Sequence, residues 1–223
     1  AGLRAMLGFR ELQLGVIADR RADPRDDLIS ILCAAEVDGE RLDDESIVQE
    51  TLLLLIGGDE TSRHVITGGL LALLEHPDQR TALAADLDQL PVAVEELLRW
   101  VSPIKNMART VTRDLELRGQ TLHEGDQVML FYPSANRDEA VFDRPDELDL
   151  TREPNPHLAF GFGPHFCLGA SLARLELRVM FSELLTRLPD LQLANDEPLP
   201  YRPSNFICGL EAMPVRFTPG GAP

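Results

Sequence analysis

The chain has 223 residues, of which 44% are hydrophobic and 26% charged, a composition typical of a globular sequence that can bury a core. Its formal net charge of −16 argues against nucleic acid or an anionic membrane as the main partner, since like charges repel. The longest apolar run, Leu52 to Ile56, is far too short to cross a bilayer, and no secretory leader pattern is present, so we expect a cytoplasmic protein.

The first part of the chain is helical in pattern. Residues 3–21 carry apolar side chains at helical spacing, and Pro24 is expected to open a second, short helix that stops before Asp38-Gly39. Asp43 can cap the next helix, which we expect to run to about Leu74. Because its middle is apolar all round, this helix is predicted to be buried on all sides.

Two further helices begin at Pro77 and Pro91, and the second of them reaches Trp100. Residues 107–133 alternate in polarity and contain glycine turn signals, which predicts short antiparallel strands. Residues 134–165 are rich in Pro, Asp and Asn and read as a long ordered loop, a kind of segment that is usually functional.

An amphipathic helix follows Cys167, and the tail from Leu191 has strand-like pieces. The apolar stripe expected on that helix comprises Leu168, Leu172, Leu175 and Val179. The predicted fold is mainly α with a small β portion, in one domain over residues 1–223. The chain opens at Ala1 inside a helical pattern, so we expect an N-terminal part of this domain to be absent.

The three cysteines, Cys33, Cys167 and Cys208, form neither a CxxC pair nor a zinc-like spacing, and their odd number argues against a disulfide framework. Cys167 lies in the most informative stretch, residues 160–169, with the sequence Phe-Gly-Phe-Gly-Pro-His-Phe-Cys-Leu-Gly. A thiolate metal ligand needs an apolar wall, inward-facing backbone amides and a positive field, which glycines and a helix start can supply. Gly169 would let a flat ligand approach closely, and His165 could donate a hydrogen bond to an anionic group at its edge.

This stretch resembles the haem-binding signature of cytochromes P450, Phe-Gly-x-Gly-x-(His or Arg)-x-Cys-x-Gly, with every fixed position filled. The resemblance implies a haem b cofactor (iron protoporphyrin IX) whose iron is bound by Cys167. Phe160, Gly161, His165 and Gly169 would contact the cofactor. The alternative is a purely structural one: a buried free cysteine in a glycine-rich turn.

Residues 57–62, Gly-Gly-Asp-Glu-Thr-Ser, lie in the middle of the long helix, where two glycines cost stability and therefore need a reason. They resemble the P450 motif (Ala or Gly)-Gly-x-(Asp or Glu)-Thr. The resemblance implies that Glu60 and Thr61 relay protons to dioxygen. Asp59 could share the role, and a helix kink with solvated acids is the alternative.

Glu96 and Arg99 form a Glu-x-x-Arg pair on one helix face, which in P450s is buried and supports the cysteine loop. The third, basic member of this group could be Arg137 or Arg152. Arg109, in the strand that follows, matches the family's haem-propionate arginine.

The order of the motifs resembles that of the P450 family over the entire chain. The chain corresponds, however, only to the C-terminal portion of the family's domain. The resemblance implies a monooxygenase that inserts one oxygen atom from O2 into a C–H bond, with electrons from a ferredoxin and its reductase. Arg174 and Arg178 are candidates for a local basic docking patch.

Two segments would line the substrate pocket, and they resemble actinobacterial P450s that hydroxylate the terminal methyl of cholesterol or cholest-4-en-3-one. The pocket residues are Ile104, Lys105, Asn106, Met107, Phe206 and Ile207. The expected substrate is an apolar small molecule, with a sterol side chain as the specific hypothesis. Alternatives are another lipid substrate, a peroxide-driven peroxygenase and a non-catalytic haem-binding protein.

Overall fold

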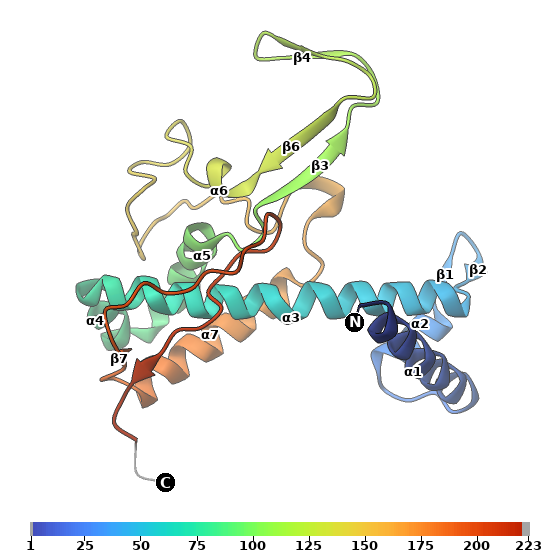
Figure 1. Ribbon diagram of the computed structural model, residues 1–223, viewed down its shortest axis with the longest axis horizontal. Helices are drawn as coiled ribbons and strands as arrows, with labels where there is room; N and C mark the ends of the chain where they lie inside the picture. The colour runs from blue at the N-terminus through green and yellow to red at the C-terminus, as the bar shows by residue number, and fades with distance from the viewer. Residues whose placement is uncertain (1, 220–223) are drawn as a thin grey trace. The chain divides into compact units, whose positions relative to one another are not determined.

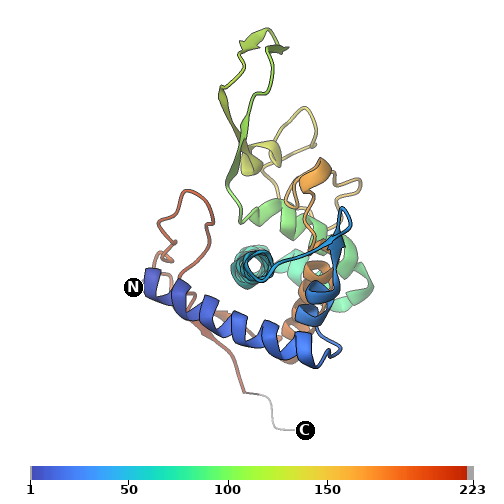
Figure 2. The same cartoon turned by 90° about the vertical axis from the view of Figure 1, so that its right-hand side faces the viewer.

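The computed structural model describes residues 2–219. The chain divides into two compact units, residues 1–59 and 60–223, and the long helix α3 (Asp44–Glu75) contributes to both. Figure 1 shows the order of the elements, and Figure 2 views α3 along its axis.

The first unit contains α1 (Gly2–Ala22), α2 (Leu28–Ala34), the short hairpin β1 (Glu36–Val37) and β2 (Glu40–Arg41), and the beginning of α3. Its buried core is small and consists of Ile17, Cys33, Ile47 and Val48. The prediction that Asp43 caps α3 is confirmed, since its Oδ1 accepts the backbone N–H of Ser46 at 2.7 Å.

The predicted start of the second helix at Pro24 is wrong. The helix begins at Leu28, because Asp27 occupies the N-cap and its Oδ1 accepts the backbone N–H of Ser30 at 2.9 Å. The Asp27 carboxylate accepts one of the backbone N–H groups that are unpaired at a helix start, and a proline side chain has no acceptor for this. Asp27 therefore sets the boundary.

The prediction that the middle of α3 is buried all round is also wrong. Leu53, Leu55 and Ile56 are 64%, 54% and 52% exposed. A helix that is apolar on all sides can be buried on all sides, but each face is buried only where another element packs against it.

The second unit holds the remaining helices: α4 (Pro77–Ala85), α5 (Leu90–Val101), α6 (Tyr132–Ala135) and α7 (Ala170–Arg187). Two short 3-10 turns, η1 (Leu87–Gln89) and η2 (Gly163–His165), lie among them. The helix starts predicted at Pro77 and Pro91 are confirmed within one residue. The core forms where α4, α5 and α7 pack with the second part of α3, around Leu73, Leu97, Leu177 and Phe181.

The predicted apolar stripe of the last helix is not the buried one. Its four members are between 51% and 87% exposed: Leu168, Leu172, Leu175 and Val179. The face of α7 that packs into the core carries instead Ala170, Leu177, Phe181 and Leu185. Both faces are apolar, so helical spacing alone could not tell which of them meets α5.

The predicted antiparallel strands are confirmed as two ladders. β3 (Asn106–Thr110) pairs with β6 (Gln127–Phe131), with Asn106 opposite Phe131, and β4 (Leu115–Leu117) pairs with β5 (Gln120–Leu122). In the tail, β7 (Gln192–Leu193) pairs with β8 (Val215–Arg216). The first two residues of β3, Asn106 and Met107, belong to the segment predicted to line the substrate pocket.

A buried charge network joins α5 to the long loop that follows α6. Glu96 and Arg99 are 0% exposed, and both carboxylate oxygens of Glu96 accept hydrogen bonds from Arg99 at 2.7 Å. Arg152 Nε donates to Glu96 at 3.1 Å, so Arg152 is the third member of the group. Arg137 instead donates to the carbonyl of Trp100 and lies over its ring.

This network also satisfies the backbone of the loop. Arg99 donates to the carbonyls of Asn136, Pro145 and Glu147. Arg152 also donates to the carbonyl of Glu147 and to two further carbonyls, those of Asp143 and Arg144. Two buried guanidinium groups therefore fix a loop that has almost no secondary structure of its own.

Replacing Glu96 by Gln is expected to destabilise the protein by about 3–5 kcal/mol, because two buried guanidinium groups would lose their counter-charge. Denaturant-induced unfolding measures the change in the free energy of unfolding. The matched control is Glu183→Gln, whose pair with Arg187 is exposed and is expected to matter by less than about 0.5 kcal/mol. Equal effects of the two changes would contradict the assignment of Glu96 as a structural centre.

Candidate functional site

Cys167 lies in the loop between η2 and α7, three residues before the first residue of the helix. Its backbone N–H donates to the carbonyl of Phe160 at 2.9 Å, and its carbonyl accepts the N–H of Ala170 at 3.3 Å. The thiol is exposed. Cys167 lies just before the N-terminus of α7, as the sequence predicted.

The tight path before Cys167 depends on two glycines. Gly161 has φ +74° and Gly163 has φ +70°, a left-handed conformation that is strained for other residues. The N–H of Phe166 then donates to the carbonyl of Gly163 at 3.0 Å, which closes the turn. The prediction of a glycine-dependent tight turn is confirmed.

The residues next to Cys167 in the sequence carry exposed apolar side chains. Phe162 is 83%, Phe166 51% and Leu168 87% exposed, an unusual concentration of apolar surface around one thiol. A Cβ built on Gly169 would lie 3.9 Å from Cys167 Sγ, so the backbone of Gly169 runs close beside the sulfur. An exposed sulfur in a loop rich in exposed apolar side chains fits a largely apolar metal macrocycle such as haem.

Phe160 anchors this loop to the body of the second unit. It is half-buried and packs against the core, and its ring lies 6.2 Å from the ring of Phe166. The guanidinium of Arg174, on α7, lies 4.6 Å above the same ring. Phe160 therefore supports the loop from beneath through both apolar and cation–π contact.

Arg174 also carries an ion pair that ties α7 to α5. Its guanidinium donates to both carboxylate oxygens of Glu95, at 2.6 and 2.8 Å, and His157 lies 3.0 Å from the same carboxylate. Burial alone would raise the pKa of Glu95, but the hydrogen bonds from Arg174 and His157 outweigh it and hold the pKa at about 2. The hydrogen bond to Glu95 raises the pKa of Arg174, with a smaller contribution from Cys167.

Asn136 positions the start of the loop and was not identified from the sequence. It is fully buried, its Nδ2 donates to Ser102 Oγ at 2.7 Å, and its Oδ1 accepts the N–H of Leu158 at 2.7 Å. Loops contain many exposed asparagines, so the sequence does not show which of them is buried and holds the backbone in place.

The second predicted pair, Glu60 and Thr61, lies on α3 in the second unit, and both residues are half-buried. Arg202 Nη1 donates to both oxygens of Glu60 at 2.5 Å, and Arg63 Nη2 lies 3.3 Å from one of them. The hydrogen bond from Arg202 lowers the pKa of Glu60, so the carboxylate form is favoured. Sequence reasoning missed Arg202, because nothing in the sequence signals a partner 142 positions away.

The structure brings together the two segments predicted to line the pocket. Ile104 forms a β-bridge with Ile207, and the N–H of Lys105 donates to the carbonyl of Phe206 at 2.8 Å. Asn106 Nδ2 donates to the carbonyl of Asn205 at 2.7 Å. Met107 follows on β3 and is half-buried.

The two predicted propionate ligands are exposed and stand apart from these contacts. Arg109 is on β3, and its Nη1 donates to the carbonyl of Ala108 at 2.8 Å. His165 lies in η2. Within residues 2–219 no hydrogen bond or ion pair joins either side chain to another predicted site residue.

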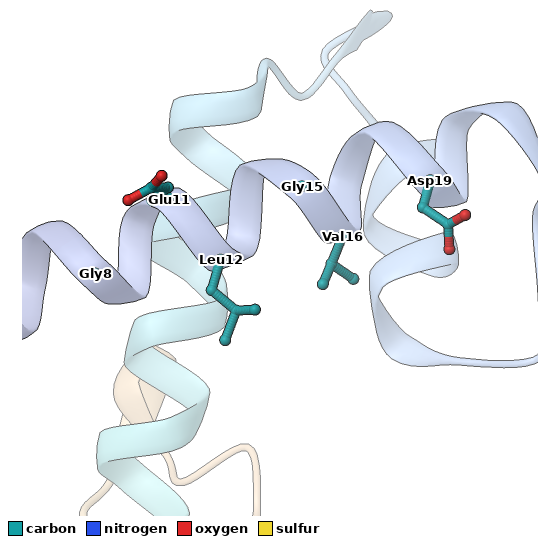
Figure 3. A pocket seen from close by; sticks show the side chains of 6 residues that line it. All are labelled: Gly8, Glu11, Leu12, Gly15, Val16 and Asp19. Atoms are coloured by element: carbon teal, nitrogen blue, oxygen red, sulfur yellow. The ribbon is translucent and has the colours of Figure 1, made fainter.

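A shallow hollow lies on α1, in the first unit. Gly8, Glu11, Leu12, Gly15, Val16 and Asp19 line it. Figure 3 shows Leu12 and Val16 on the same side of the helix. It is one face of a single helix, and none of the predicted site residues lines it.

The chain is similar to known proteins over nearly its whole length. The family model described as Cytochrome P450 matches residues 11–208. The steroid C26-monooxygenase of Mycolicibacterium smegmatis is 57% identical over 211 residues, which are 95% of this chain and 53% of that protein. The methyl-branched lipid omega-hydroxylase of Mycobacterium bovis is 51% identical over 202 residues, 90% of this chain and 47% of that protein.

Solved structures show the same fold. A Bacillus megaterium protein in complex with testosterone matches with a TM-score of 0.92 and 36% identity, over 97% of this chain and 60% of that one. The chain thus spans about half the length of the curated relatives it matches. Among the described helices, none combines the length and hydrophobicity that a membrane crossing requires.

The depressed pKa of Glu95 predicts a specific acid sensitivity. A carboxyl with a folded-state pKa of about 2 and an ordinary value of 4.5 contributes stability above pH 4.5 that is lost as the pH falls towards 2. The contribution is on the order of 3 kcal/mol at most. Glu95→Gln should therefore flatten the fall of the free energy of unfolding in this range, measured by denaturation at a series of pH values. An unchanged pH dependence would show that Arg174 and His157 do not hold this carboxylate.

Proposed function

This chain belongs to the cytochrome P450 family, and on that premise we propose that the whole protein is a haem-thiolate monooxygenase. It inserts one oxygen atom from dioxygen into a C–H bond of an apolar substrate, and the other atom leaves as water. The observation that carries this proposal is Cys167, an exposed thiol at a helix N-terminus in the complete haem-binding signature.

The family's cofactor is haem, and we propose haem b, held by residues of the second unit. Cys167 would bind the iron, and Phe160, Gly161 and Gly169 would form the backing of the cysteine loop. Arg109 and His165, both exposed, would bind the propionates. Haem supplies the activation of dioxygen, and a thiolate ligand favours cleavage of the O–O bond.

Glu60 and Thr61 would deliver protons to the reacting oxygen. The Thr61 hydroxyl is both a donor and an acceptor, so it can pass a proton on while it receives another from the Glu60 carboxyl. Arg202 lowers the pKa of Glu60, so the resting group is a carboxylate that must first take up a proton.

The substrate proposed in most detail is a sterol side chain, hydroxylated at its terminal methyl (position 26 or 27). Support comes from the 57% identity to a steroid C26-monooxygenase and from the likeness to a protein solved with testosterone. The pocket would include Ile104, Met107, Phe206 and Ile207, side chains that suit an apolar ligand. A methyl-branched lipid is the second candidate, because a hydroxylase of such lipids is 51% identical.

A ferredoxin and its reductase are the proposed electron donors. The chain's net charge of −16 would repel an acidic partner, so docking needs a local basic patch. Arg174 is largely neutralised by Glu95, whereas Arg178 is exposed and donates only to a backbone carbonyl. Arg178 is therefore the better candidate of the two.

Cys167→Ala in the whole protein should abolish the thiolate-type band of the reduced carbon-monoxide difference spectrum, whereas Cys33→Ala and Cys208→Ala should keep it. Cys33 is buried in the first unit and Cys208 lies beside the pocket segment, so the two controls test burial and proximity separately. Identical spectra from all three variants would remove the thiolate assignment. Turnover with peroxide but not with ferredoxin would favour a peroxygenase, and no turnover at all a non-catalytic haem protein.

Thr61→Val is expected to lower kcat by about 10²-fold and to raise peroxide release per dioxygen consumed, because a positioned proton donor is lost. Thr67→Val on the same helix is the control, since its hydroxyl only back-bonds to the carbonyls of Arg63 and His64. Product yield and peroxide are measured with cholest-4-en-3-one. Equal coupling of both variants would remove Thr61 from the relay.

A further inference from the structure

Residues 200–211 form a hairpin, here called the 200–211 hairpin. Tyr201 bridges to Leu210, the N–H of Arg202 donates to the carbonyl of Gly209 at 2.9 Å, and the N–H of Glu211 donates to the carbonyl of Pro200 at 2.8 Å. The side chains of Phe206 and Ile207 lie at its tip.

The tip is bound to the segment that precedes β3. In addition to the Lys105–Phe206 bond, the N–H of Cys208 donates to the carbonyl of Pro103 at 3.0 Å. The hairpin and residues 103–106 therefore form one continuous wall of the proposed substrate pocket, held by backbone hydrogen bonds.

The base of the hairpin is bound to α3 at two points. Arg202 pairs with both oxygens of Glu60 at 2.5 Å. One turn along α3, the ring of His64 lies so close to Gly209 that a Cβ there would sit 2.0 Å from Nδ1, so only glycine fits. His64 is 4% exposed and neither ring nitrogen has a hydrogen-bond partner, so this contact is packing, and Arg202 supplies the polar attachment.

The ion pair is suited to breaking and reforming. Glu60 is 25% and Arg202 43% exposed, and partly solvated pairs contribute weakly to stability. The buried Glu96–Arg99 pair, at 0% exposure, is of the opposite kind. A change in the position of the hairpin can therefore alter the position of the Glu60 carboxylate, and the reverse.

We propose that Arg202 is a positioning residue that couples the seating of the 200–211 hairpin, and hence of the substrate pocket wall, to the placement of the Glu60 carboxylate. Naming Glu60 as the relay acid rests on the proposed function, but the coupling itself does not. Because coupling is reciprocal, removing the Glu60 charge weakens ligand binding at the hairpin tip, although Glu60 is not among the proposed pocket residues.

The test uses the whole, haem-loaded protein and the variants Arg202→Gln, Glu60→Gln and their double mutant. Each single change should raise the hydrogen-exchange rate of the Lys105, Cys208 and Arg202 amides and weaken cholest-4-en-3-one binding, about two- to fivefold. The double mutant should be no weaker than either single variant, since both remove the same bond. Binding is read from the spectral titration, and folding from thermal unfolding.

Arg63→Gln is the matched control, because Arg63 also faces Glu60 but belongs to α3 itself. It should leave the exchange rates and the ligand affinity unchanged. Unchanged exchange in the Arg202 and Glu60 variants, additive effects in the double mutant, or an equal effect of Arg63→Gln would each overturn the coupling. The exchange measurement keeps its meaning even if the carbon-monoxide spectrum rejects the thiolate, so the two failures are distinguishable.

Discussion

The buried carboxylate of Glu96 is the constraint on which the second unit depends. It accepts hydrogen bonds from Arg99, Arg152 and Asn155 and from the backbone N–H of Asp149, so one side chain joins α5 to the loop that follows α6. A loop of this length with little regular structure needs such partners, because its carbonyls would otherwise be buried without hydrogen bonds. The charge network is therefore a scaffold, and it takes no part in the proposed chemistry.

From this scaffold the chain runs to Cys167 with each step held in place. Asn136 fixes Leu158, Phe160 anchors the turn in the core, and the Arg174–Glu95 pair ties the start of α7 to α5. These contacts lead to the exposed sulfur of Cys167, in a loop with exposed apolar side chains. Elsewhere in the proposed site, a partly exposed ion pair joins Glu60 to Arg202 of the 200–211 hairpin.

Most short local signals were predictable from the sequence, although the Asp27 cap of α2 was missed, and distant partnerships were not. Helix starts at Pro77 and Pro91, the Asp43 cap and the glycine turn before Cys167 depend on a few neighbouring residues, and all were predicted correctly. The buried face of α7 was predicted wrongly, because two apolar stripes compete and only tertiary packing decides between them. Arg152 and Arg137 could not be separated for the same reason, and Arg202 was missed altogether. The family resemblance supplied the candidate site residues, and the structure supplied the partners that hold them.

The central claim is that the sulfur of Cys167 bonds to haem iron. X-ray absorption at the iron edge of the whole, haem-loaded protein examines that bond directly, because sulfur and nitrogen scatter differently in the first coordination shell. A sulfur neighbour in the parent protein, replaced by a light atom in Cys167→His, is the expected result. A first shell of nitrogen and oxygen alone in the parent protein, or a sulfur retained in the variant, would contradict the account.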